Sequence, residues 1–142
     1  MNPLPTLIDP GRLADDGGRI HGELELAGLG RVAAACMPGT NAVVVVDLQF
    51  SRDRQGRRQM HGTVTLQAQL PCARCLQAVD FGWVAHPNVL WVRPGETEEN
   101  GTCEVVEWSM PVALVTVVEE ELLLALPMMV THEGDCMAGV PS

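Results

Sequence analysis

The sequence has no lysine, and it has no apolar run of the roughly 18 to 20 residues that a membrane-spanning helix needs. Its first residues, Met1 to Pro5, also lack the basic start and apolar stretch of a secretory signal peptide. We therefore expect a cytoplasmic protein with no membrane partner. Thiols stay reduced there, so the five cysteines favour metal-binding or structural roles over disulfides.

The motifs of the common enzyme classes are also absent. The chain has no Gly-x-Ser-x-Gly, no Walker phosphate loop, no dinucleotide fingerprint and no His-Glu-x-x-His. With four histidines and eighteen acidic residues, some carboxylate–histidine pairs arise by chance and are no evidence of catalysis. We expect a protein that is not an enzyme and has no catalytic residues.

Charge and aromatic content argue against broad nucleic-acid binding. All nine basic residues are arginine, and the formal net charge is −9. An acidic domain is repelled by phosphate backbones. The three tryptophans and two phenylalanines are too few for an extended base-stacking surface, so we expect them in the core.

The length of 142 residues fits one domain, and a hydrophobic content of 46% is enough for a core. Residues 1–19 are rich in proline and glycine, so we expect an irregular N-terminal segment. Residues 94–101 read as an acidic, turn-rich loop.

Alternating apolar and polar residues predict antiparallel strands near 20–26, 42–50, 61–70 and 77–85. The second and third of these flank a polar tip and should form a hairpin. His86 and Pro87 interrupt the fourth strand, and 89–92 can resume it. The segment 29–37 is ambiguous.

Residues 111–126 have apolar positions at helical spacing, with Pro127 as a stop and Ser109 as a candidate N-cap. Three consecutive glutamates in this helix cannot all face solvent, so we expect Glu121 at the edge of the core. The predicted fold class is α+β: an antiparallel sheet packed against this C-terminal helix.

Two cysteines, Cys72 and Cys75, form a Cys-x2-Cys knuckle between two predicted strands. His132 and Cys136 follow in the C-terminal segment, which completes the four Cys/His ligands of a structural zinc site. Two other interpretations stay open: a knuckle without metal, and a redox or regulatory thiol pair. A thioredoxin-like role fits poorly because that motif lies where a strand enters a helix. Cys36 is expected in the core, and Cys103 is a possible substitute ligand.

Four arginines fall within seven residues at the predicted hairpin tip: Arg52, Arg54, Arg57 and Arg58. Arginines can make bidentate contacts to phosphates, so this tip is a candidate nucleic-acid contact. The alternative is a solvated tip that prevents edge-to-edge pairing of strands. Phe50 is the one aromatic residue nearby, so a stacking platform for single-stranded RNA is missing.

Taken together, four stretches resemble the YceD family, whose members occur in bacteria and plastids and are associated with accumulation of 23S ribosomal RNA. Each stretch matches a family motif, in the family's order, and together they span nearly the whole chain: Leu7 to Pro10, Gly62 to Cys75, Val118 to Pro127, and the tail with His132 and Cys136.

The resemblance implies a non-enzymatic ribosome biogenesis factor that supports synthesis, processing or stability of 23S rRNA during large-subunit assembly. The expected partners are a large-subunit precursor, a ribosomal protein or an rRNA-processing factor. Since the chain is acidic, we favour contacts with a protein or particle. Direct RNA binding through the arginine tip and a thiol-based redox role are the alternatives.

Overall fold

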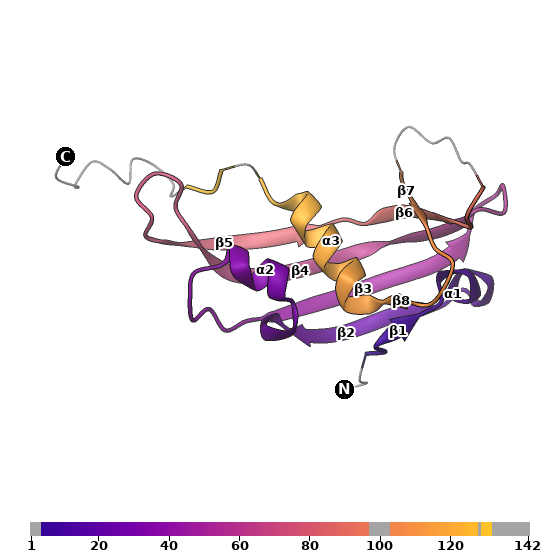
Figure 1. The fold of residues 1–142 in the computed structure, drawn as a ribbon, viewed down its shortest axis with the longest axis horizontal. Coiled ribbons are helices and arrows are strands. Elements are labelled where there is room, and N and C mark those ends of the chain that lie inside the picture. The colour runs from indigo at the N-terminus through magenta and orange to yellow at the C-terminus, as the bar shows by residue number, and fades with distance from the viewer. Residues whose placement is uncertain (1–3, 97–102, 128, 132–142) are drawn as a thin grey trace.

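The computed structural model describes residues 4–96, 103–127 and 129–131 (Figure 1). Its elements in chain order are β1 (Leu7–Ile8), α1 (Pro10–Asp16), β2 (Arg19–Glu25), a short 3-10 turn (Leu26–Gly28), α2 (Gly30–Ala35), β3 (Val43–Arg52), β4 (Arg58–Pro71), β5 (Ala78–Ala85), β6 (Asn88–Val92), β7 (Glu104–Glu107), β8 (Val112–Ala113) and α3 (Leu114–Ala125).

A six-stranded sheet carries the fold, with the order β2-β3-β4-β6-β7 and with β5 also paired to β4. The pairs among β2, β3, β4, β5 and β6 are antiparallel, whereas β7 joins β6 in parallel. The four predicted strands and the resumed strand after His86 and Pro87 are therefore confirmed. The sheet pairing confirms the hairpin, which brings Arg52 opposite Arg58.

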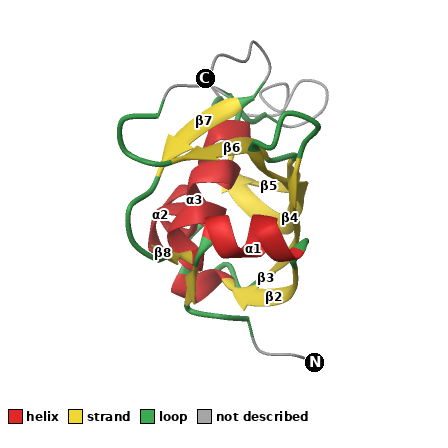
Figure 2. Cartoon of the chain, turned by 90° about the vertical axis from the view of Figure 1, so that its right-hand side faces the viewer, coloured by secondary structure: helices red, strands yellow, loops and turns green. Residues whose placement is uncertain are grey.

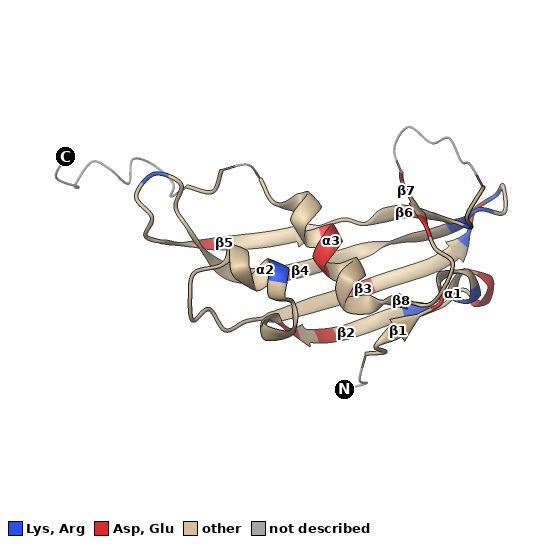
Figure 3. Cartoon of the chain, viewed as in Figure 1, with Lys and Arg blue, Asp and Glu red and all other residues tan. Residues whose placement is uncertain are grey.

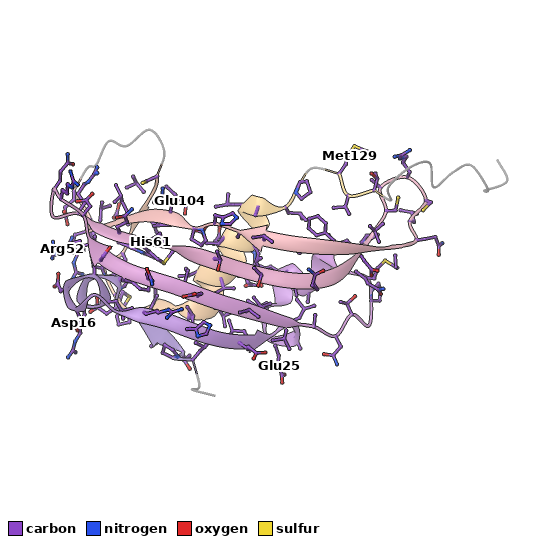
Figure 4. The ribbon with its side chains drawn as sticks, turned by 180° about the vertical axis from the view of Figure 1, so that it is seen from behind. Asp16, Glu25, Arg52, His61, Glu104 and Met129 are labelled. Atoms are coloured by element: carbon purple, nitrogen blue, oxygen red, sulfur yellow. The ribbon has the colours of Figure 1, made fainter. Side chains whose placement is uncertain are left out.

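One face of the sheet is covered and the other is open. Figures 1 and 2 show α2 and α3 on one side, and Figure 4 shows the opposite face without a helix over it. The alternation that predicted the strands explains this arrangement, because every second side chain of β3 and β4 turns towards the helices. These inward side chains are fully buried, among them Val44, Val46, Leu48 and Val64. The predicted α+β fold class is confirmed.

Helix α3 begins later than the sequence indicates. It spans Leu114–Ala125 rather than 111–126, because Val112 and Ala113 form β8 against β1. The N-cap position is Ala113, and it makes no side-chain capping bond, so the prediction that Ser109 caps the helix is wrong. Within the described part of the chain, no helix has the length and hydrophobicity to cross a membrane.

The N-terminal segment is more regular than predicted, since 1–19 includes β1 and α1. The Asp9 carboxylate accepts hydrogen bonds from the backbone N–H groups of Gly11 and Arg12, at 3.1 and 3.3 Å. Pro10 follows in the first turn of the helix, where its missing N–H costs nothing. The Asp-Pro pair was therefore a helix start signal that the proline and glycine content obscured.

Candidate functional site

The two candidate sites from the sequence lie at opposite ends of the sheet. Strand β4 has 14 residues and joins the arginine tip, at Arg58, to the cysteine knuckle after Pro71. At about 3.3 Å per residue, it separates them by roughly 45 Å. Figure 3 shows arginines at both ends, and Figure 4 shows Arg52 and Met129 at opposite ends. The two sites therefore cannot contact one small ligand together.

The cysteine knuckle is a tight turn between β4 and β5, as predicted. The N–H of Cys72 donates to the carbonyl of Gln77 at 2.9 Å, and the Cys72 carbonyl accepts from the N–H of Leu76 at 2.9 Å. Cys72 is fully buried and Cys75 is half-buried. The turn therefore brings both cysteines to one short loop, which is what a pair of metal ligands requires.

The segment after α3 reaches this knuckle. The N–H of Ala73 donates to the carbonyl of Val130 at 2.8 Å. In the sequence, His132 comes two residues after Val130. His132 and Cys136 lie outside the described residues, so the four-ligand set stays a prediction. Within the described ranges, no three His, Cys, Asp or Glu side chains gather as a metal site would require.

The remaining cysteines lie elsewhere. Cys36 is buried, donates a weak hydrogen bond to the Val32 carbonyl at 3.4 Å, and has its pKa raised by burial, as a core thiol should. Cys103 contacts the side chain of Asn88, which lies opposite His61 on β4. About ten residues of strand separate His61 from the knuckle, so Cys103 is too distant to act as a substitute ligand.

Leu76, directly after the knuckle, has a φ of 65°, which is strained for a residue with a side chain. Its side chain is 70% exposed and has little packing to lose. We expect Leu76→Gly to raise the free energy of unfolding by about 0.5–1 kcal/mol, because glycine adopts this conformation without strain. Urea unfolding monitored by circular dichroism measures the change. Lower stability in this variant would contradict the account of the turn.

Three of the four arginines at the hairpin tip are engaged within the protein. Arg52 donates to Asp15 of α1 and to the carbonyl of Gly56, both at 2.6 Å. Arg57 donates to Asp53 at 2.6 Å. By contrast, Arg54 makes no ion pair or hydrogen bond with the rest of the described chain.

The third engaged arginine of the tip, Arg58, stacks on an aromatic ring that the sequence pattern does not connect with it. The Arg58 guanidinium lies 5.1 Å from the centre of the Trp108 ring, and Arg93 lies 4.3 Å from the same centre. Trp108 in turn meets Trp91 edge-on. These contacts hold the tip to the strands and the loop beside it. The geometry therefore favours the structural interpretation of the tip over a phosphate-binding one.

The three consecutive glutamates of α3 have three different roles. Glu119 is 8% exposed and accepts hydrogen bonds from the backbone N–H groups of Arg31 and Val32, at 2.7 and 3.4 Å. It thereby caps α2 from another helix. Glu120 is exposed and pairs with the Arg31 guanidinium at 2.6 Å. Glu121 is half-buried, in accord with the prediction, but the more buried Glu119 was not foreseen.

Glu121 lines a cavity of about 250 Å³ between α3 and the strands β6 and β7. Among the described residues, the Nε1 of Trp91 is a buried hydrogen-bond donor without an acceptor, and Trp91 lines the same cavity. The acidic residues of α3 and β7 appear red in Figure 3. The apolar part of the lining consists of Met60, Val89, Trp91, Val106, Val112 and Val117.

Burial, a hydrogen bond shared with Glu104, and the negative charges of Glu104 and Glu120 raise the pKa of Glu121 to about 7. A carboxyl whose pKa is higher in the folded state stabilises the fold below its unfolded value of 4.5. That stabilisation is lost as the pH rises through about 7.

We therefore expect Glu121→Gln to be more stable than wild type by about 1–2 kcal/mol at pH 8, a figure reduced for partial solvent screening. The difference should be small at pH 4 to 5, where the carboxyl is protonated in the folded state. Urea unfolding across this pH range measures it. A difference that does not change with pH would show that Glu121 is already ionised at pH 5.

The open face of the sheet is polar around Asp47, but it also exposes the side chains of Val43, Val45 and Val84. Arg19 on β2 makes a two-pronged contact with Asp47 on β3, both bonds at 2.9 Å, and this contact lowers the pKa of Asp47. Beside Asp47, a shallow groove of about 650 Å³ runs past His61 and His86. His61 is labelled in Figure 4. Among the described residues that line this groove, no side-chain nitrogen or oxygen is both buried and without a hydrogen-bond partner.

Comparison with protein families gives a match to the C-terminal part of the chain. A protein-family model described as "Large ribosomal RNA subunit accumulation protein YceD" matches residues 60–142, which is more than half of the chain. The matched range contains the knuckle, α3 and the cavity. No curated protein and no solved structure matches the chain.

Proposed function

Since the chain belongs to the YceD family and so has a role in large ribosomal subunit RNA accumulation, we propose that it acts as a non-enzymatic ribosome biogenesis factor. It supports synthesis, processing or stability of 23S rRNA during large-subunit assembly, and it works in the cytoplasm. The observation that carries this proposal is the family match across the knuckle and α3.

Contacts with a protein or an assembling particle suit this molecule better than general RNA binding. The net charge of −9 repels phosphates. The arginines that could offset it are mostly engaged, since Arg52 and Arg57 pair with aspartates and Arg58 stacks on Trp108. The partner is therefore a large-subunit precursor, a ribosomal protein or an rRNA-processing factor.

Sedimentation of cell extracts through a sucrose gradient tests this proposal. The protein should travel with large-subunit precursors, and Arg54→Ala should travel in the same fractions, because a protein contact does not need that side chain. Loss of co-sedimentation in Arg54→Ala, together with salt-sensitive binding of wild type to 23S fragments, would support direct RNA binding instead. A protein that stays at the top of the gradient would contradict the proposal.

We also propose that one zinc ion is held by Cys72, Cys75, His132 and Cys136. The knuckle brings the side chains of Cys72 and Cys75 to one loop, as two zinc ligands would require, and the bond from Ala73 to Val130 brings the chain to the knuckle just before His132. Zinc would supply structure here, by tying the end of the chain to the β4–β5 turn.

Metal analysis of the purified protein tests the zinc proposal. We expect about one zinc per chain, which is lost in Cys72→Ser/Cys75→Ser and kept in the control Cys103→Ser. A wild-type protein that is purified without chelators and contains no zinc would count against the site. So would zinc that remains in the double variant.

A further inference from the structure

We propose that the cavity between α3 and β7 binds a lysine or arginine side chain presented by a basic segment of a partner protein. The inference deepens the proposed function, on which it rests for the identity of the partner.

The rim of the cavity is acidic. Four carboxylates line it: Glu104 and Glu107 from β7, and Glu120 and Glu121 from α3. In the described part of the chain, only Glu120 among them pairs with a cation, Arg31. Like charges held this close repel one another, so a cation placed between β7 and α3 would relieve the repulsion.

The inside of the cavity is apolar, which suits the hydrocarbon stem of a long basic side chain. Met60, Val89 and Val117 are buried and form part of its wall. Lysine and arginine cover apolar surface with their methylene groups and place the charge at the polar end. A cavity of about 250 Å³ has room for one such side chain, but not for a folded domain.

Trp91 adds a feature that an acidic surface patch alone would lack. The residue is 3% exposed, and its Nε1 has no hydrogen-bond partner in the described part of the chain. A buried unpaired donor costs free energy. The Nε1 atom has almost no accessible surface, so neighbouring side chains would have to move slightly before a peptide carbonyl beside the bound cation could accept from it. The cavity therefore suits a basic peptide better than a free inorganic cation.

The raised pKa of Glu121 is consistent with this ligand. Their interaction raises the pKa of Glu121 to about 7, because two adjacent carboxylates resist ionising together. A bound cation favours the ionised form, so binding should release a proton and tighten between pH 6 and pH 8. An RNA phosphate favours the protonated carboxyl, so its binding should instead weaken between pH 6 and pH 8.

Nitrogen-15 NMR of the purified full chain tests the proposal, with hexa-arginine as the probe and hexa-citrulline as its uncharged counterpart. The indole N–H signal of Trp91 should shift and saturate with hexa-arginine and respond little to hexa-citrulline. Trp83 is the internal reference, because its Nε1 is buried and donates to the Leu122 carbonyl at 2.7 Å. Its signal should stay in place.

A pair of double variants separates the cavity from diffuse charge attraction. Glu104→Gln/Glu121→Gln should weaken hexa-arginine binding about tenfold or more, as expected for losing a charged hydrogen-bond partner. Glu23→Gln/Glu25→Gln removes two exposed carboxylates from β2 and should change affinity by no more than about twofold.

Three outcomes would overturn the proposal: a Trp91 signal that does not move, equal weakening in both variants, or an RNA fragment that shifts Trp91 at lower concentration than the peptide does. The titration uses purified protein, so its failure leaves the ribosomal proposal standing. Conversely, failure of the ribosomal proposal in cells does not change the titration result.

Discussion

Gly62→Ala should lower the free energy of unfolding by about 3 kcal/mol, the largest single-residue effect expected in this protein. Gly62 lies in the middle of β4, opposite Leu48. A Cβ atom added there would be 2.0 Å from the backbone carbonyl oxygen of Asp47. Because that neighbour is backbone within the central pair of strands, it cannot move without breaking the register of β3 and β4.

Gly30→Ala is the matched control for this substitution. Gly30 begins α2, its φ is not in the left-handed region, and a Cβ there meets nothing within 4 Å. Alanine at this position should be neutral or stabilising by up to about 1 kcal/mol. Urea unfolding of both variants measures the contrast. A Gly62→Ala protein as stable as wild type would show that β3 and β4 are not packed as closely as described.

Glu119→Ala should lower the free energy of unfolding by about 2–3 kcal/mol, through a lost helix cap and two N–H groups left without an acceptor. The Glu119 carboxylate is the group that satisfies the N–H groups of Arg31 and Val32 at the start of α2. Leu29, at the N-cap position, offers no side-chain acceptor. Since Val32 is fully buried, water cannot easily replace the carboxylate there.

Two neighbouring substitutions identify the cause. Glu120→Ala removes only an exposed ion pair with Arg31 and should cost less than about 1 kcal/mol. Glu119→Gln keeps an acceptor oxygen and should cost less than Glu119→Ala. Amide hydrogen exchange at Arg31 and Val32 should become faster in Glu119→Ala alone. Equal destabilisation by Glu119→Ala and Glu120→Ala would contradict the capping role.

The strands could be predicted because their signal is local. In β3 and β4, apolar and polar residues alternate over many positions, and one covered face leaves little freedom in register. Strand β7 was not predicted, since it is short and pairs in parallel with β6, far from any hairpin signal. Helix α1 is hidden in the sequence for another reason, because Pro10 and Gly11 are also typical of irregular segments.

The candidate sites were harder to predict, because they depend on contacts between distant parts of the chain. Nothing near Arg58 in the sequence indicates that it stacks on Trp108. Likewise, Glu119, Glu120 and Glu121 are chemically identical in sequence. Their roles differ because of how α2 and β7 pack against α3. Glu119 caps α2, Glu120 pairs with Arg31, and Glu121 lines the cavity.

The ratio of 23S to 16S rRNA in cells that lack this protein tests the central claim most directly. We predict that the ratio falls, and that wild type and Arg54→Ala both restore it. Cys72→Ser/Cys75→Ser should fail to restore it although the variant is expressed and folded. An unchanged ratio after deletion would contradict the account.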